Sequence, residues 1–504
     1  MSTRNSLSVG LELELPVARG DDGRAGDARA ALAALHALRF AHSPEAPTLR
    51  TSDGSLLGVG SAWGMSSFDN GYNNLETSFA PVFGETGSLN RLARQVFAEQ
   101  SELEQALAAH NLYALNLAEH PSTVLTAEHY QRLRAPRPIY DYWIQHRGWD
   151  HAAGMDAKAQ NGPTTGVAAT QAIASLNLLL LAAPAFIALF ANSPFEAGHD
   201  TGRRENRLQL WRRMFARARY PADRRLCELP ARPFTGLADY LRWVFAPDTV
   251  MHAIAADASY KTFEDLVVLD TPLSLLAFLH GPAQTGRGLH GRQSSLITPS
   301  MAHLEQLQFA HFLDARIRFA FDTLPDREEF LGSLDGAGAT EALFARHCRH
   351  VYLEGRVAGN NLADAGLLAD AGETVAASCV MAPSALQTGL LNAPGAWETL
   401  HAALSWAQLD GLRDACIRDG LAAEYAGVRS RDIAALVLEL ASTGLAADEQ
   451  WMLAYPRHVL ASGENGADRA LRLVARHHGP LEDALQVLLQ SRRMVVVPPP
   501  ACDC

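Results

Sequence analysis

A strictly alternating segment near the N-terminus most constrains what this chain can fold into. Residues 7–16 read LSVGLELELP, with leucines at alternate positions on one side and Glu12 and Glu14 on the other. Successive side chains of a strand point to opposite faces of a sheet, so the segment predicts a β-strand with one apolar face. The rise of a strand separates the two glutamate side chains by about 6.5–7 Å. The predicted sheet therefore has a core on one side and paired carboxylates on the other.

A second acidic strand follows. Asp69-Asn70-Gly71 is a turn signal, and residues 75–79 continue as a strand that carries Glu76. Ser88 is predicted to cap a helix that runs to about His110. Carboxylate oxygens suit hard cations, and Mg²⁺ in particular when a nucleoside triphosphate supplies further oxygens. An ordinary wet face of an antiparallel sheet would also carry such residues, so both interpretations stay open.

Arginines form the second set of candidate site residues. Arg204 and Arg207 are spaced as neighbours on one helical turn, and alternation in VYLEGR predicts Glu354 and Arg356 on one strand face. Paired arginines bind phosphate or carboxylate groups bidentately. A surface face of salt bridges is the alternative.

Composition excludes several classes of protein. Of 504 residues 48% are hydrophobic, which is enough to bury a large core. The 43 basic and 55 acidic residues give a net charge of −12, which argues against nucleic acid or an anionic membrane as partner. The two lysines, Lys158 and Lys261, lie outside any phosphate-binding P-loop motif. The partners we expect are therefore small molecules.

The remaining patterns bear on location and organisation. The apolar stretch 176–191 is shorter than a membrane span and contains Asn177 and Pro184, so we expect a buried core helix. Scattered cysteines and the lack of a basic–apolar leader predict a cytoplasmic protein. We expect one catalytic domain over residues 1–495 with helical insertions, mainly helical in its second half. Residues 496–504 form a Pro/Cys tail, in which Cys502 and Cys504 are either a frayed end or a handle for metal or redox chemistry.

Six segments in order together resemble the glutamate–cysteine ligase superfamily, in its plant-like and proteobacterial branch of carboxylate–amine ligases. They depart from the family pattern at 118–119, 157–161 and 357–359, around the expected substrate pocket. The segments are GLELEL (10–15), DNGYNNLETSFAPV (69–82), EHP (119–121), FIALFANSPFEAG (186–198) followed by RRENRLQLW (203–211), YLEGR (352–356) and GENGADRAL (463–471).

The resemblance implies an α+β fold, a glutamine-synthetase-like curved antiparallel sheet that forms a funnel surrounded by helices. It implies an ATP-dependent ligase that joins a carboxylate and an amine through an acyl phosphate. The namesake reaction joins L-glutamate and L-cysteine to γ-glutamylcysteine in glutathione biosynthesis. Two alternatives stay open: a ligase of the same superfamily with another acid and amine, and a non-catalytic nucleotide-binding regulator.

The resemblance also implies roles for individual residues, with ATP and Mg²⁺ as cofactors. His120 is expected to order its loop rather than transfer protons. The aromatic side chains Tyr140, Tyr142 and Trp143 either form an acceptor wall or simply pack. The implied metal ligands are Glu12, Asp69, Glu76 and Glu354 with Glu14 in support; Arg356 and Arg207 bind phosphate or substrate carboxylate; Gln160, Asn161 and Arg204 contact the nucleotide or the acid.

Overall fold

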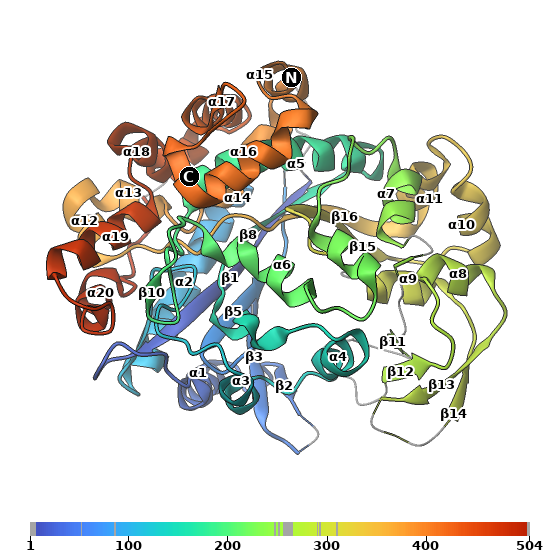
Figure 1. Cartoon of the computed structure of the whole chain (residues 1–504), viewed down its shortest axis with the longest axis horizontal. Coiled ribbons are helices and arrows are strands. Elements are labelled where there is room, and N and C mark those ends of the chain that lie inside the picture. The colour runs from blue at the N-terminus through green and yellow to red at the C-terminus, as the bar shows by residue number, and fades with distance from the viewer. Residues whose placement is uncertain are drawn as a thin grey trace.

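One large antiparallel sheet with helices packed against it dominates the chain (Figure 1). A computed structural model describes residues 7–51, 53–84, 87–245, 248–249, 253–255, 266–289, 291, 294–308 and 311–500. The sheet has ten strands, of which β6 and β7 pair with β1 outside the main path. In spatial order the main path is β15 (Ala315–Phe321), β16 (Cys348–Gly355), β8 (Asn161–Val167), β1 (Ser8–Arg19), β5 (Asn74–Phe79), β4 (Gly64–Phe68), β3 (Leu56–Ser61) and β2 (Thr48–Arg50); the two others are β6 (Val82–Phe83) and β7 (Leu112–Ala114).

The predicted N-terminal strand is confirmed as β1, and it lies in the middle of the sheet. Its leucines are buried, whereas Glu12 and Glu14 keep part of their surface exposed. Glu14 lies opposite Glu76 of β5, which confirms the second predicted strand, and Glu12 lies opposite Gly162 of β8. Directly paired residues of an antiparallel sheet share a face, so the carboxylates of two strands meet on one side.

Helices contact the sheet and share one hydrophobic core with the leucines of β1. These are α2 (Ser88–Ala108), α5 (Ala172–Phe190) and α14 (Ala382–Asn392), and α16 (Trp406–Asp419) and α17 (Ser430–Thr443) pack against α5 in turn. The helices that follow residue 364 gather along the upper left of Figure 1. The opposite face of the sheet carries the polar residues, so one side is left for a site.

The apolar stretch of the sequence forms the centre of this core, as predicted. Among the described residues one helix, Ala169–Phe190, is long and apolar enough to cross a membrane, with a mean hydropathy of 2.2. In this fold 94% of that segment is buried inside the protein. Pro184 lies within α5 and is itself buried.

Two helix starts differ from the predictions. Helix α2 begins at Ser88 as expected, but Gly87 in the left-handed region (φ 63°) is its N-cap, and no side chain caps it. The sequence also predicts a helix that Asp432 caps and that Gly444 ends. Helix α17 instead begins at Ser430, two residues earlier, because strand β18 (Val428–Arg429) leads directly into it. Gly444 ends α17 as predicted.

The remaining elements surround the sheet. The described part of the tail packs against the core through Val496 and Val497, whereas Cys502 and Cys504 lie outside the described residues. A separate four-stranded sheet consists of β11 (Ala253–Ala255), β12 (Leu266–Leu269), β13 (Gln284–Gly288) and β14 (Ser294–Ile297). The other helices are α1 (Arg29–His42), α3 (Ala127–Leu133), α4 (Pro138–Tyr142), α6 (Leu210–Phe215), α7 (Leu237–Val244), α8 (Leu275–His280), α9 (Met301–Leu307), α10 (Arg327–Ser333), α11 (Ala339–His347), α12 (Ala365–Ala371), α13 (Glu373–Ser378), α15 (Ala396–Ala403), α18 (Ala454–Ser462), α19 (Gly466–His477) and α20 (Leu485–Arg492).

Candidate active site

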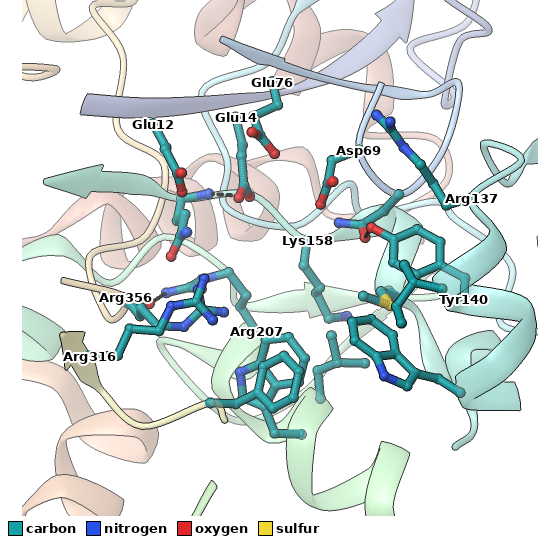
Figure 2. A pocket seen from close by; sticks show the side chains of 18 of the residues that line it. Glu12, Glu14, Asp69, Glu76, Arg137, Tyr140, Lys158, Arg207, Arg316 and Arg356 are labelled. Atoms are coloured by element: carbon teal, nitrogen blue, oxygen red, sulfur yellow. Dashed lines mark hydrogen bonds between the residues drawn. The ribbon is translucent and has the colours of Figure 1, made fainter. Parts of the chain in front are cut away.

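A cavity of about 340 Å³ lies over the polar face of the sheet (Figure 2). Its walls combine carboxylates, cations and aromatic rings from segments far apart in the sequence. The lining residues are Glu12, Glu14, Asp69, Asn70, Glu76, Arg137, Ile139, Tyr140, Trp143, Met155, Lys158, Gln160, Arg207, Leu210, Trp211, Phe312, Arg316, Arg318 and Arg356.

Four of the predicted metal ligands form one wall of this cavity. Figure 2 shows the carboxylates of Glu12, Glu14, Asp69 and Glu76 side by side, facing the open space. Burial raises the pKa of Glu14 well above its ordinary value, and the charges of Glu76, Asp69 and Glu12 raise it further, against the opposing effect of Arg207. The wall therefore concentrates negative charge at a place where protonation of a carboxylate, or a bound cation, would stabilise the protein.

The donors on this wall are of the kind that hard divalent cations prefer. As they stand, no three His, Cys, Asp or Glu side chains within the described ranges are arranged to hold a metal ion. Four carboxylates on one wall nevertheless supply the oxygen donors that suit Mg²⁺. The raised pKa of Glu14 means that its ionised form is disfavoured unless a positive charge lies beside it. The residues therefore fit the cation by their chemistry.

Arginines form the opposite wall. Arg316 and Arg318 alternate along β15, and Arg316 lies opposite Glu354 of β16. The Arg316 Nε–H donates to Glu354 Oε2 at 2.9 Å, and Arg356 Nη1 donates to Glu354 Oε1 at 2.7 Å. Although burial acts to raise it, these guanidinium groups hold the pKa of Glu354 well below its ordinary value. Three arginines share one carboxylate, which leaves this wall positively charged.

Glu354 therefore differs from the predicted picture. It is 1% exposed, it is absent from the cavity lining, and it forms ion pairs with Arg316, Arg318 and Arg356. The strand register accounts for this, because it sets Glu354 beside Arg316 rather than beside the carboxylates of β1. In this arrangement Glu354 orients the arginines, and its role as a metal ligand stays a prediction.

Arg207 and Arg356 lie together in the cavity, where the sequence placed both in the site. Arg207 Nη2 donates to the backbone oxygen of Arg356 at 3.0 Å, and its Nε donates to Glu205 at 2.8 Å. The Arg356 guanidinium lies 5.6 Å from the ring centre of Trp211 and 5.7 Å from that of Phe312. These contacts fix both guanidinium groups in place before any anion binds.

The three residues predicted to contact the nucleotide or the acid do not lie together: one of them lines the cavity and two do not. Gln160 lines the cavity, and its buried Oε1 accepts no hydrogen bond from any residue that the structure describes. Asn161 points away, since its Nδ2 donates to the backbone oxygen of Asn361 at 2.8 Å. Arg204 lies outside the cavity lining and pairs with Asp468 at 2.5 Å. It does not share a helical turn with Arg207, because the chain bends at Arg204 before a 3₁₀ turn, Asn206–Gln209.

Aromatic side chains complete the cavity. Tyr140 and Trp143 line it, with their ring centres 5.5 Å apart, whereas Tyr142 is buried away from it. Trp211 and Phe312, stacked 4.2 Å apart, line it as well. Aromatic rings therefore do line the cavity, but Tyr142 lies elsewhere, and Trp211 and Phe312 were not among the predicted aromatic residues.

His120 lies outside the cavity lining, in keeping with its predicted role in the loop. Its Nδ1 accepts a hydrogen bond from the backbone N–H of Ser122 at 3.3 Å. Burial lowers the pKa of His120 to about 3, so the ring stays neutral and is poorly suited to proton transfer near pH 7.

Several cations that line the cavity were not predicted from the sequence. The alternation in ARIRF (315–319) could have revealed Arg316 and Arg318, because it places both on one strand face. Arg137 and Lys158 lie in loop segments without a comparable pattern. Only the folded chain brings them to the sheet.

Comparisons with known proteins bear on this site. The family model of Glutamate-cysteine ligase family 2 matches residues 58–265, which confirms the resemblance predicted from the sequence over that part of the chain. No curated protein sequence matches the chain.

The solved structures that are similar to the chain include the following two. One is a bifunctional glutathione synthetase from Pasteurella multocida, at 12% identity and a TM-score of 0.46, covering 96% of this chain and 51% of that one. The other is a glutamate–cysteine ligase from Francisella tularensis in complex with AMP, at 11% identity and a TM-score of 0.44, covering 97% and 88%. The chain spans about half the length of the first.

Proposed function

Since residues 58–265 match the glutamate–cysteine ligase family 2 model, we propose that this chain is an ATP-dependent carboxylate–amine ligase that forms an amide through an acyl phosphate. The acid and amine we propose are L-glutamate and L-cysteine. One observation carries the proposal: a wall of four carboxylates faces a wall of arginines across a single cavity. Transfer of the γ-phosphoryl group to a carboxylate requires both kinds of wall. The nucleotide and the acid are anions, so arginines are needed to bind them, and carboxylates are needed to hold the cation that neutralises the triphosphate.

The carboxylate wall would hold the cation. Glu12, Glu14, Asp69 and Glu76 would bind Mg²⁺, which when bound neutralises the triphosphate and draws electrons from the γ-phosphorus. The protein itself contributes by holding the four carboxylates on two paired strands and one turn. The backbone N–H of Gln160 donates to Glu14 at 3.0 Å and fixes its orientation.

The arginine wall would bind the anionic substrates. Arg207 and Arg356 would hold phosphate oxygens or the substrate carboxylate with forked hydrogen bonds. The acid's carboxylate is already a nucleophile, so these residues need only bring it in line with the γ-phosphorus and offset the repulsion between anions. The amine then attacks the acyl carbon, and phosphate leaves.

A second candidate is a ligase of the same class with another acid and amine. The aromatic side of the cavity favours it, since Tyr140, Trp143, Trp211 and Phe312 offer a larger apolar surface than a cysteine side chain needs. A non-catalytic nucleotide-binding regulator is a third candidate. We also propose that the enzyme works in the cytoplasm, where ATP is available and its buried thiols, Cys379 and Cys416, stay reduced.

The test is phosphate release from ATP and Mg²⁺ with glutamate and a panel of amines that includes cysteine. Glu12→Gln removes a carboxylate from the cavity wall, and Glu104→Gln, on the exposed face of α2, is the matched control. Release that needs glutamate plus cysteine, and that is lost only in Glu12→Gln, would support the proposed reaction.

Other outcomes are equally informative. Release with a different acid or amine would keep the ligase and change its substrates. Binding of Mg-ATP without any release across the panel would favour the regulator. Release that survives Glu12→Gln at the wild-type rate would contradict the role given to the carboxylate wall.

A further inference from the structure

Lys158 is held in a network of charges at the edge of the cavity. Of the two lysines, only Lys158 falls in the part of the chain that the structure describes, and its side chain lines the cavity while being 6% exposed. Its Nζ donates to Glu119 and, at 3.0 Å, to Glu196. An ammonium group has three N–H donors, and these two hydrogen bonds use two of them.

The two carboxylates beside Lys158 differ in what holds them. Arg213 donates two hydrogen bonds of 2.6 Å to Glu196. Although burial acts to raise it, Arg213 and Lys158 hold the pKa of Glu196 well below its ordinary value. Glu119 is 1% exposed and receives from neutral Asn206 a bond of 3.0 Å. Glu196 therefore stays ionised, and Glu119 is the carboxylate that is free to change its charge.

Burial raises the pKa of Glu119 to about 8, and Glu196 adds to this effect while Lys158 opposes it. Two further acidic groups interact electrostatically with this cluster. Against the effect of burial, the charge of Lys158 acts to lower the pKa of Asp156, and the charge of Asp150 acts to raise the pKa of Arg213. A carboxyl group that titrates near neutral pH suits proton transfer. Paired groups whose environments push their pKa values apart often divide acid and base roles.

We propose that Lys158 and Glu119 form a proton relay that deprotonates the acceptor amine, an inference that rests on the proposed ligase function. Lys158 passes a proton to Glu119, which leaves a neutral amine and a carboxylic acid. The neutral Nζ takes a proton from the acceptor ammonium and frees its lone pair. The C–N bond forms, the C–O bond to phosphate breaks, and the second nitrogen proton leaves with the phosphate. Glu119 then releases its proton to solvent.

In this scheme Lys158 is a catalytic residue, and Glu119 is a positioning and proton-accepting residue that acts through it. The other residues of the cavity cannot fill this role as well. The guanidinium groups do not lose their protons near pH 7, and the carboxylates of the opposite wall bind the proposed cation. Lys158 and Gln160, two residues apart, both line the cavity, so the relay would act within the space proposed for the substrates.

The experiment compares two amines that differ in charge. Hydroxylamine is neutral near pH 7 and traps an acyl phosphate as a hydroxamate without needing a base, whereas an alkyl ammonium acceptor must lose a proton first. Lys158→Arg keeps the charge and the ion pairs but cannot give up its proton, and Lys158→Met removes both. We expect both variants to lose about 100-fold or more in ligation of the ammonium acceptor, while hydroxamate formation stays within about threefold of wild type.

Glu119→Gln adds a pH profile. In wild type, ligation of the ammonium acceptor should rise through about pH 8 relative to hydroxamate formation, and Glu119→Gln should remove this rise. Normal ligation in Lys158→Arg would overturn the relay, because charge alone would then suffice. Equal loss with both amines would overturn it in favour of a structural role.

Two further outcomes separate a relay from a binding role of Lys158 and from failure of the ligase itself. If Lys158 only binds the acceptor's carboxylate, Lys158→Met will raise KM for an amino acid acceptor but leave its methyl ester unaffected, which overturns the relay. If wild type forms neither ADP nor hydroxamate with any acid, the ligase proposal itself fails and takes the relay with it. Hydroxamate formation in a variant also shows that the variant is folded.

Discussion

Replacing Glu14 with glutamine should stabilise the protein while abolishing its activity. Glu14 lies directly opposite Glu76 in the sheet, with Asp69 and Glu12 nearby on the same cavity wall. Burial and these neighbours raise the pKa of Glu14 well above its ordinary value. The substitution keeps the shape of the side chain, and its amide oxygen can still accept the hydrogen bond from Gln160.

The size of the effect follows from the charges. At about 6 Å and an effective dielectric constant near 20, two carboxylates repel by about 3 kcal/mol. Attraction between Glu14 and Arg207, which the substitution also removes, and partial exposure of Glu14 offset part of this. We therefore expect the free energy of unfolding of Glu14→Gln to exceed that of wild type by about 1–2 kcal/mol at pH 8.

The pH dependence distinguishes this account from a general packing effect. A carboxyl group whose pKa is raised by folding stabilises the folded state below its unfolded pKa, and this contribution is lost as pH rises through the folded pKa. The advantage of Glu14→Gln should therefore be small near pH 4 and grow towards pH 8. Comparing the two proteins cancels the titration of all other groups.

The assay is urea unfolding of wild type, Glu14→Gln and the exposed control Glu104→Gln between pH 4 and 8, with and without Mg²⁺. Mg²⁺ should raise the urea midpoint of wild type more than that of Glu14→Gln, because a ligand that binds the folded state stabilises it. A lower midpoint for Glu14→Gln at pH 8, or an advantage independent of pH, would refute the reasoning. Equal Mg²⁺ shifts in both proteins would remove Glu14 from the cation site.

Three other predictions concern the arginine wall, with the buried Glu354 that holds it, and the aromatic side of the cavity. Glu354→Gln should lower the free energy of unfolding at pH 7 by about 3–5 kcal/mol, because buried arginines lose their shared partner; a urea midpoint unchanged within error would contradict this. Arg356→Lys should raise KM for ATP or the acid at least tenfold at an unchanged urea midpoint, since lysine lacks the forked geometry, and wild-type steady-state kinetics would count against it. Trp143→Ala should raise KM for the acceptor amine and leave hydroxamate formation intact, and an equal loss of both would place Trp143 outside the acceptor pocket.

The sequence by itself determined which residues of β1 and of β5 carry carboxylates on one face of each strand. Alternation is a local property of the chain, so it fixes which side chains within one strand share a face before any long-range contact is known, whereas the register between β1 and β5 brings the two faces together. The same holds for α2 and α5, whose apolar residues follow from helical periodicity and length. Local order also placed Glu354 near Arg356, which directly follows the last residue of β16.

The tertiary structure alone decided what those carboxylates face. Glu354 contacts arginines rather than the other carboxylates because the register between β15 and β16 pairs it with Arg316. Register depends on how whole strands pack against each other. Arg204 lies outside the cavity lining because its side chain pairs with Asp468, 264 residues further along the chain. The role proposed for Lys158 depends on Glu119 and Glu196, which distant segments bring beside it without any periodic signal. Local patterns report which face a side chain takes, whereas its partner is set by the packing of distant segments.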